Sequence, residues 1–128
     1  MNYKSFFSLV LLIFMFASVS VLATGNPQPL KPVSIPDDVK SIIDKSCFGC
    51  HNTDSKNDKA KEKLDLKTLD SLDKSKMIHA LKEISETVEE NEMPPAKFLE
   101  KFPDKKLTDA EKKKLMDWAN NEAKSLMK

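Results

Sequence analysis

The segment that decides the fold reads Lys-Ser-Lys-Met-Ile-His-Ala-Leu-Lys-Glu-Ile-Ser-Glu-Thr-Val-Glu over residues 74–89. Its main apolar residues recur at intervals of four, three and four positions and are Met77, Leu81, Ile84 and Val88. This spacing places them on one face of an α-helix. The sequence therefore predicts a helix over 74–89 that buries a single stripe.

One further helix is expected on each side of this segment. The residues Thr108-Asp-Ala-Glu111 form a capping box, in which a hydroxyl and a carboxylate satisfy the first free N–H groups of a helix. Residues sharing one face then continue to near the end of the chain, at Leu115, Trp118, Ala119, Ala123 and Leu126. On the N-terminal side, Pro36 and two aspartates open a helix whose apolar face holds Val39, Ile42, Ile43 and Cys47.

The segment that follows the first of these helices is less regular. Residues 52–63 contain almost nothing apolar beyond Ala60 and are expected to be a solvated loop. A short apolar segment of one or two helical turns follows, at Leu64, Leu66, Leu69 and Leu72. Runs of Val, Ile and Thr are too few for a sheet. We therefore expect an all-α domain of three or four helices.

Length and composition exclude several classes of protein. A chain of 128 residues allows one domain. Lys4 is the only basic residue before position 24, so the basic and acidic residues that follow balance, which gives no indication of nucleic-acid binding. The two glycines leave no room for a phosphate-binding glycine loop. The aromatic residues after position 23 make a thin core, which an apolar cofactor could complete; they are Phe48, Phe98, Phe102 and Trp118.

The start of the chain has the features of a secretory signal. Lys4 precedes an apolar run over residues 6–17, and the small side chains of Val21 and Ala23 suit a signal peptidase. We expect residues 1–23 to be a signal peptide, residues 24–35 a proline-rich tether and residues 36–128 the domain. The protein would then be periplasmic or otherwise exported, with no membrane span after cleavage. The alternative is an uncleaved segment that anchors the protein in the membrane.

The sequence Cys47-Phe-Gly-Cys-His51 carries the chemistry. Two thiols three positions apart, with a histidine directly after the second, form the pattern for covalent attachment of c-type haem. Each sulfur adds to one vinyl group of the porphyrin, and the imidazole becomes the proximal ligand of the iron. Two alternatives are a disulfide or thiol redox pair, and a zinc site that also uses His79.

Met93 is the expected distal ligand. It lies outside the expected helices and precedes Pro94-Pro95, which makes a stiff loop able to hold a sulfur against iron. The alternative is that the two prolines only end the preceding helix. Core packing accounts for the other methionines after position 23, which are Met77, Met116 and Met127. His79 lies about 200° around the helix from the buried stripe and is expected on the surface.

Three motifs in order resemble a known family. Cys47-Phe-Gly-Cys-His51, Met93-Pro-Pro95 and Leu107-Thr-Asp-Ala-Glu111 followed by Trp118 are similar to small mono-haem c-type cytochromes, and more narrowly to bacterial haem-binding-domain proteins. The resemblance covers residues 35–125. It implies a class I-like cytochrome c fold around one covalently bound haem c, whose first and last helices cross, with Ala119 or Ala123 permitting close approach.

The resemblance also assigns roles to residues. Cys47 and Cys50 would be the attachment sites, His51 the proximal ligand and Met93 the distal ligand. The function expected from this ligand set is electron transfer between redox partner proteins, without enzymatic activity. The alternative is a haem-based gas sensor or haem enzyme with a labile sixth ligand.

The surroundings of the haem can also be predicted. Five apolar residues are expected to bury it: Val39, Ile42, Leu81, Phe98 and Trp118. Four lysines near the Met-Pro-Pro loop form either a docking patch for a partner or a solvated face; they are Lys97, Lys101, Lys105 and Lys106.

Overall fold

The computed structural model describes residues 31–128. The expected signal peptide and most of the expected tether lie outside these residues. The helices in the described part are α2 (Asp37–Ser46), α3 (Asp58–Lys63), α4 (Lys74–Glu89), α5 (Ala96–Leu99) and α6 (Asp109–Met127), with single 3-10 turns η1 (Leu69–Ser71) and η2 (Pro103–Lys105). This part contains no strand, which confirms the all-α fold class.

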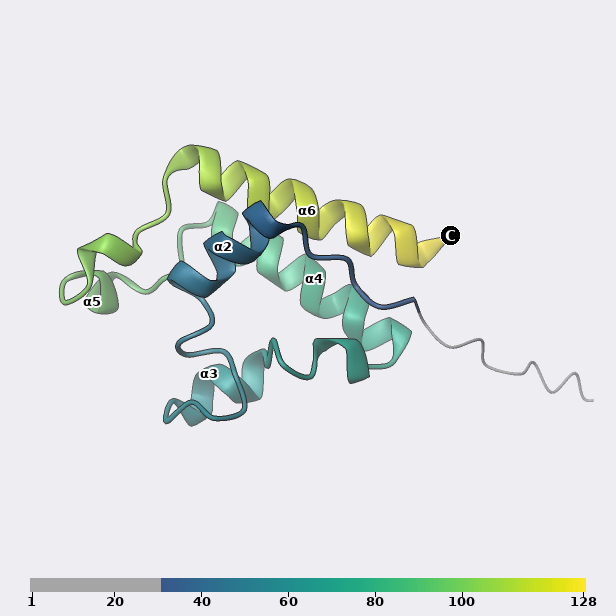
Figure 1. Cartoon of the computed structure of the whole chain (residues 1–128), viewed down its shortest axis with the longest axis horizontal. Coiled ribbons are helices and arrows are strands. Elements are labelled where there is room, and N and C mark those ends of the chain that lie inside the picture. Colours follow the sequence, from purple (N-terminus) through teal and green to yellow (C-terminus); the bar gives the residue numbers. More distant parts are fainter. Residues whose placement is uncertain (1–30) are drawn as a thin grey trace, which may run out of the picture.

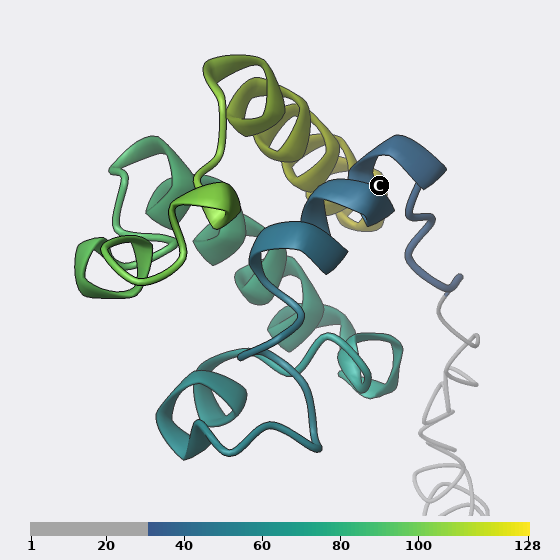
Figure 2. The same cartoon turned by 60° about the vertical axis from the view of Figure 1, so that its left-hand side comes forward.

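The helices α4 and α6 form the main packing pair, and α2 lies across α6 (Figures 1 and 2). The predicted stripe of α4 is buried, with Met77 and Leu81 fully inaccessible to solvent. Ala119 and Ala123 are buried on α6, so small side chains do lie in the packed face of the last helix. The most extensive contact of α6, however, is with α4 and not with the first helix of the domain, α2.

The helix ends follow from local sequence. The Asp73 carboxylate accepts a hydrogen bond from the Lys76 N–H at 2.9 Å and caps α4. At α6, the Thr108 hydroxyl accepts from the Glu111 N–H, and the Glu111 carboxylate accepts from the Thr108 N–H. Both halves of the predicted capping box are therefore present.

Two short helices were not expected. Residues 52–63, which were expected to be a loop, contain α3. The helix buries none of its residues and is solvated as predicted, whereas Asn52 at the start of the segment is buried. The Asn57 side chain caps this helix by accepting from the Ala60 N–H, and Lys61 pairs with Asp58 one turn earlier. The segment has no apolar stripe, so periodicity could not reveal it. The four-residue helix α5 is too short to show a period.

The core begins inside the range expected to be a tether. Val33 is buried and belongs to the same apolar cluster as the residues of α4 and α6. The short apolar segment after α3 contributes Leu69, which is buried in η1. No helix between residues 31 and 128 has the length and apolar character needed to cross a membrane.

Candidate functional site

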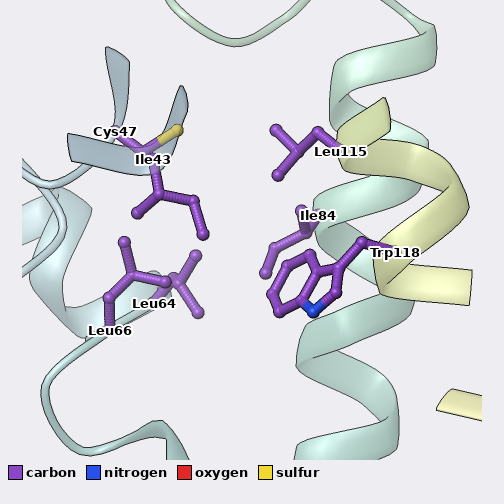
Figure 3. Close-up of a pocket in the computed structure, with 7 residues that line it drawn as sticks. All are labelled: Ile43, Cys47, Leu64, Leu66, Ile84, Leu115 and Trp118. Carbon is purple, nitrogen blue, oxygen red and sulfur yellow. The ribbon is translucent and has the colours of Figure 1, made fainter. Parts of the chain in front are cut away.

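A pocket lies between two walls of the domain. Figure 3 shows the end of α2 and the segment after α3 on one side, and α4 with α6 on the other. The space between the walls is about 210 Å³, part of it open to solvent. Its lining is apolar apart from one thiol and consists of Ile43, Cys47, Leu64, Leu66, Ile84, Leu115 and Trp118. The enclosed part of this space is far smaller than a haem, so the walls must move apart to admit a group of that size.

Cys47 lies where α2 ends and faces this pocket. Its N–H donates to the Ile43 carbonyl at 2.8 Å. Burial raises the pKa of the Cys47 thiol to about 11, and the neighbouring Cys50 adds to the rise. Both thiols are free. A thiol with a pKa as high as that of Cys47 is protonated at neutral pH.

The motif forms one tight turn after α2. The N–H groups of Cys50 and His51 both donate to the Cys47 carbonyl, at 3.1 and 3.0 Å. The His51 carbonyl accepts from the Leu66 N–H at 3.1 Å. The turn is thus tied to the segment whose leucine side chains line the pocket.

The His51 ring is oriented by a backbone carbonyl. Its Nδ1 lies 3.1 Å from the oxygen of Leu64. Because a carbonyl can only accept a hydrogen bond, Nδ1 must carry the proton, and the lone pair is left on Nε2. Histidine ligands of metals are commonly fixed in this way, with one nitrogen donating to a carbonyl and the other facing the metal.

Asn52 is a site residue that the sequence did not reveal. It is buried, its amide Nδ2 donates to the Phe48 carbonyl within the motif, and its Oδ1 accepts from the Asp54 N–H at 2.9 Å. Asparagine readily closes such turns. A polar residue in a solvated segment gave no signal that it would be buried beside the motif.

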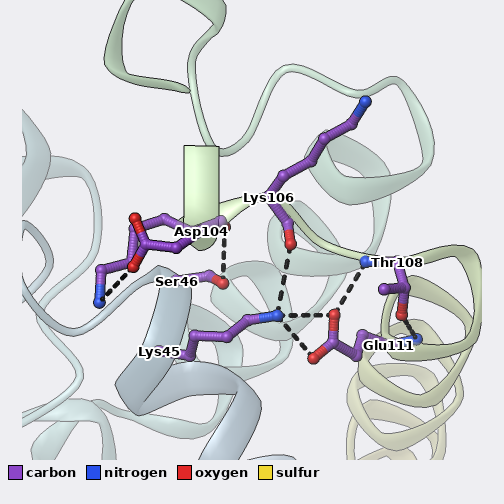
Figure 4. Close-up of polar contacts among 7 residues, drawn as sticks. Lys45, Ser46, Asp104, Lys106, Thr108 and Glu111 are labelled. Atoms are coloured by element: carbon purple, nitrogen blue, oxygen red, sulfur yellow. Dashed lines mark hydrogen bonds and ion pairs between the residues drawn. The ribbon is translucent and has the colours of Figure 1, made fainter. Parts of the chain in front are cut away.

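A second set of polar contacts holds the residues just before Cys47 (Figure 4). The Lys45 ammonium contacts both carboxylate oxygens of Glu111, at 2.6 and 2.7 Å, and the Lys106 carbonyl at 3.3 Å. The Ser46 hydroxyl donates to the Lys105 carbonyl at 2.8 Å. These contacts attach the end of α2 to the start of α6.

Met93 stands apart from the pocket. It follows the end of α4, is 37% exposed and does not line the pocket. Its N–H donates weakly to the Thr87 carbonyl at 3.4 Å, and the next residue, Pro94, is buried behind a cis peptide bond. Of the four predicted site residues, Cys47 lines the pocket, whereas Cys50, His51 and Met93 do not.

The other methionines are only partly as expected. Met77 is fully buried in the core, and Met116 is partly buried and packs against the core. Met127 is 52% exposed, so its predicted role in the core was wrong. It is the last residue of α6 and lies beyond the buried residues of this helix.

The zinc alternative is not assembled in the structure. The His79 side chain is 76% exposed and lies 4.0 Å from Glu83, on the surface as predicted. Within residues 31–128, no three side chains of His, Cys, Asp or Glu come together in a way that could hold a metal ion.

Of the five residues expected to bury the haem, one lines this pocket. Trp118 lines the pocket, whereas Val39, Ile42 and Leu81 are buried elsewhere in the core. Phe98 is half-buried and packs on Phe102 instead, with ring centroids 4.9 Å apart. The residues missed are Ile43, Leu64, Leu66, Ile84 and Leu115. Ile43 could have been found, because it lies one helical turn before Cys47 on the same face.

An all-helical domain with a tightly turned CxxCH motif, an imidazole whose Nδ1 contacts a backbone carbonyl and an apolar pocket beside a thiol fits the class of haem-binding domains. The family comparison agrees: the chain belongs to the haem-binding domain family, which matches residues 54–121, just over half of its length. The match includes Leu64, Met93 and Trp118 and begins after the CxxCH motif of residues 47–51. No curated protein and no solved structure matches the chain.

Proposed function

We propose that this protein is an exported c-type cytochrome that carries electrons through one covalently attached haem with His51 and Met93 as ligands. The observation that supports this most strongly is the contact of His51 Nδ1 with the Leu64 carbonyl, because it prepares Nε2 to bind iron. Membership of the haem-binding domain family supports haem as the cofactor.

The thiols provide the attachment. Cys47 borders the pocket, and the turn that bonds both Cys50 and His51 to the Cys47 carbonyl keeps the second thiol and the imidazole next to it. Both sulfurs are free for thioether bonds to the two vinyl groups of haem. The haem supplies an iron that changes between two oxidation states, and the chain supplies its ligands, its burial and its orientation.

Met93 is the proposed distal ligand for a reason of packing. Its side chain is exposed, so no core contact must be broken for its sulfur to move. Met77, in contrast, is fully inaccessible to solvent, and removing it from the core would cost packing energy. The walls of the pocket must separate when haem enters, and we propose that the segment carrying Met93 closes on the opposite side of the iron.

The compartment and the partners are part of the same proposal. The signal-like residues 1–23 support export, and redox partner proteins would dock near the haem edge. The side chains of Lys97, Lys101 and Lys106 are exposed near the Met-Pro-Pro loop, while Lys105 is half-buried and pairs with Asp104 at 3.5 Å. These charges are available to an acidic partner.

The visible spectrum of the exported protein, oxidised and reduced, tests the haem directly. With Met93 as ligand, the oxidised protein should show the weak long-wavelength charge-transfer band from sulfur to iron. Met93→Ala should abolish this band, and Met77→Ala should leave it in place. A band that survives the loss of Met93 would assign the ligand to another residue.

The position of Met93 outside the pocket lining favours one alternative function, a gas sensor or haem enzyme with a labile sixth ligand. Carbon monoxide separates the two. A carrier whose iron has six ligands should bind it slowly when reduced, and Met93→Ala should bind it readily because the mutation opens a coordination position. Rapid binding by the unmutated protein would overturn the carrier proposal.

A further inference from the structure

The backbone of Val33 and Ser34, which we name the strap, is held against the domain although it precedes α2. The Val33 side chain is buried, and its N–H donates to the Asp70 carboxylate at 2.8 Å. Asp70 belongs to η1, which is fixed to the core by the buried Leu69. The segment from residue 31 onward runs beside α6 in both views (Figures 1 and 2).

The strap also holds a residue of the pocket wall. The indole Nε1–H of Trp118 donates to the Ser34 carbonyl at 2.8 Å. Trp118 comes from α6, and its ring forms one wall of the pocket opposite Leu64 and Leu66 (Figure 3). A tryptophan that presents its ring to an apolar space and its N–H to a carbonyl is fixed at both ends. The Val33 N–H, which Asp70 binds, and the Ser34 carbonyl, which Trp118 binds, are therefore separated by one peptide unit of the strap.

We propose that Asp70 is a positioning residue for the haem, acting through the strap to hold the Trp118 ring against the cofactor. This inference rests on the proposed function, because it concerns the environment of the bound haem. The Asp70 side chain lies at the surface, does not line the pocket and makes its contact with the strap.

The physical consequence is a change in the reduction potential. When the anchor is lost, the Ser34 carbonyl is less constrained, the indole can tilt, and water gains access to the haem face. Water stabilises the more highly charged ferric state relative to the ferrous state, so the potential falls. A carboxylate outside the pocket thus controls the access of water to the haem.

Two substitutions isolate the hydrogen bond from the charge. Asp70→Asn and Asp70→Ala remove the same negative charge, but only asparagine keeps an oxygen that can accept from the Val33 N–H. We expect Asp70→Asn to retain the strap. Both variants are compared at the potential at which half of the haem in Asp70→Asn is reduced. At this potential, the ratio of reduced to oxidised haem in Asp70→Ala should be at least about twofold lower. This corresponds to a reduction potential ~18 mV lower, at 59 mV per tenfold change in the ratio.

A matched control removes an aspartate that does not contact the strap. Asp73→Ala deletes the cap of α4 and destabilises the helix, so its melting temperature should fall while its reduction potential stays unchanged. Trp118→Phe keeps an aromatic ring but loses the N–H donor, and its potential should fall as in Asp70→Ala. Trp118 is the only tryptophan of the chain, so its fluorescence lifetime reports the distance and orientation of the indole relative to the haem.

The experiment is a redox titration of the haem-loaded full chain and its variants, with the fluorescence lifetime measured on those samples that retain Trp118. Different potentials and different lifetimes in the asparagine and alanine variants would support the strap. Equal potentials in these two variants would overturn it, as would an equal fall in Asp73→Ala, which would mean that lost stability alone moves the potential. An unmutated protein without haem would refute the proposed function instead, so the two failures are distinguishable.

Discussion

Glu111 joins the end of α2 to the start of α6, and its replacement should lower stability by a calculable amount. Its carboxylate accepts from the Thr108 N–H at 2.8 Å and contacts the Lys45 ammonium with both oxygens (Figure 4). The side chains of Lys45 and Glu111 are only 31% and 26% exposed. This ion pair should therefore contribute at the upper end of the range for surface pairs, about 1 kcal/mol.

Two variants separate the charge from the cap. Glu111→Gln keeps an acceptor for the Thr108 N–H but loses the charge, and should cost about 1 kcal/mol. Glu111→Ala also loses its half of the capping box and should cost about 2 kcal/mol. At roughly 4–8 °C per kcal/mol for a domain of this size, the melting temperature should fall by about 6 °C and about 12 °C. The exposed pair of Lys40 and Asp44 on α2 supplies the control, because Asp44→Asn should cost only about 0.3 kcal/mol.

The effect depends on pH with a defined sign. The contacts with Lys45, and then with Thr108, hold the pKa of Glu111 below its ordinary value. A carboxyl whose pKa is depressed by folding contributes stability above the pKa of the unfolded state, about 4.3, and loses it as the pH falls through the folded value. The difference between the unmutated protein and Glu111→Gln should therefore be constant at neutral pH and shrink in acid below about pH 4.

The assay is thermal unfolding of the haem-loaded protein at pH 7 and at pH 3, followed by Trp118 fluorescence, which rises when the indole leaves the haem. Other carboxyls with lowered pKa values titrate in the same range and are unchanged by the mutation, so they cancel in the difference; they are Asp38, Asp58, Asp65 and Asp73. A loss for Glu111→Gln no larger than that for Asp44→Asn would refute the reasoning. A difference of the same size at pH 3 would also refute it.

Three further predictions concern the site and the core. Asn52→Ala should cost about 1–3 kcal/mol in urea unfolding, because the Phe48 carbonyl loses its partner beside the motif; no loss would mean that water replaces the amide. Met77→Ala should cost ~2–5 kcal/mol, because this side chain is fully inaccessible to solvent, and a loss under about 1 kcal/mol would contradict the buried stripe. Cys47→Ala combined with Cys50→Ala should release the haem into acid–acetone, whereas the unmutated protein should retain it; haem released from both would exclude covalent attachment.

The long helices could be predicted because their signals are local. The stripe of α4 and the capping box of α6 are encoded within a few turns of sequence, and both helices occur where these signals place them. The helices α3 and α5 were missed because a helix of one or two turns has no measurable period. Its existence depends on a cap such as Asn57 and on the chain around it.

The site was predictable to the extent that it is contiguous. The motif from Cys47 to His51 specifies its own chemistry within five residues. The carbonyl that orients His51, in contrast, comes from Leu64, 13 residues further along, and the backbone of any residue could have supplied it. No side-chain pattern encodes such a partner, so it could only be found once the fold was known.

The same distinction explains why the two sides of the proposed haem site differ. On the proximal side, the His51 ring is fixed by the hydrogen bond that Nδ1 makes to the Leu64 carbonyl, and the His51 carbonyl accepts from the Leu66 N–H. On the distal side, the Met93 sulfur is exposed and outside the pocket lining, so a bond from sulfur to iron would have to draw it inward. The free energy needed to move Met93 inward would reduce the net stability of the bond from its sulfur to iron by the same amount.

Distal ligation should therefore be lost under milder conditions than the ligation by His51. Mild denaturant should abolish the sulfur-to-iron band before α4 and α6 unfold. Loss of the band and of helical circular dichroism at the same denaturant concentration would show that the distal side is as firmly held as the proximal one.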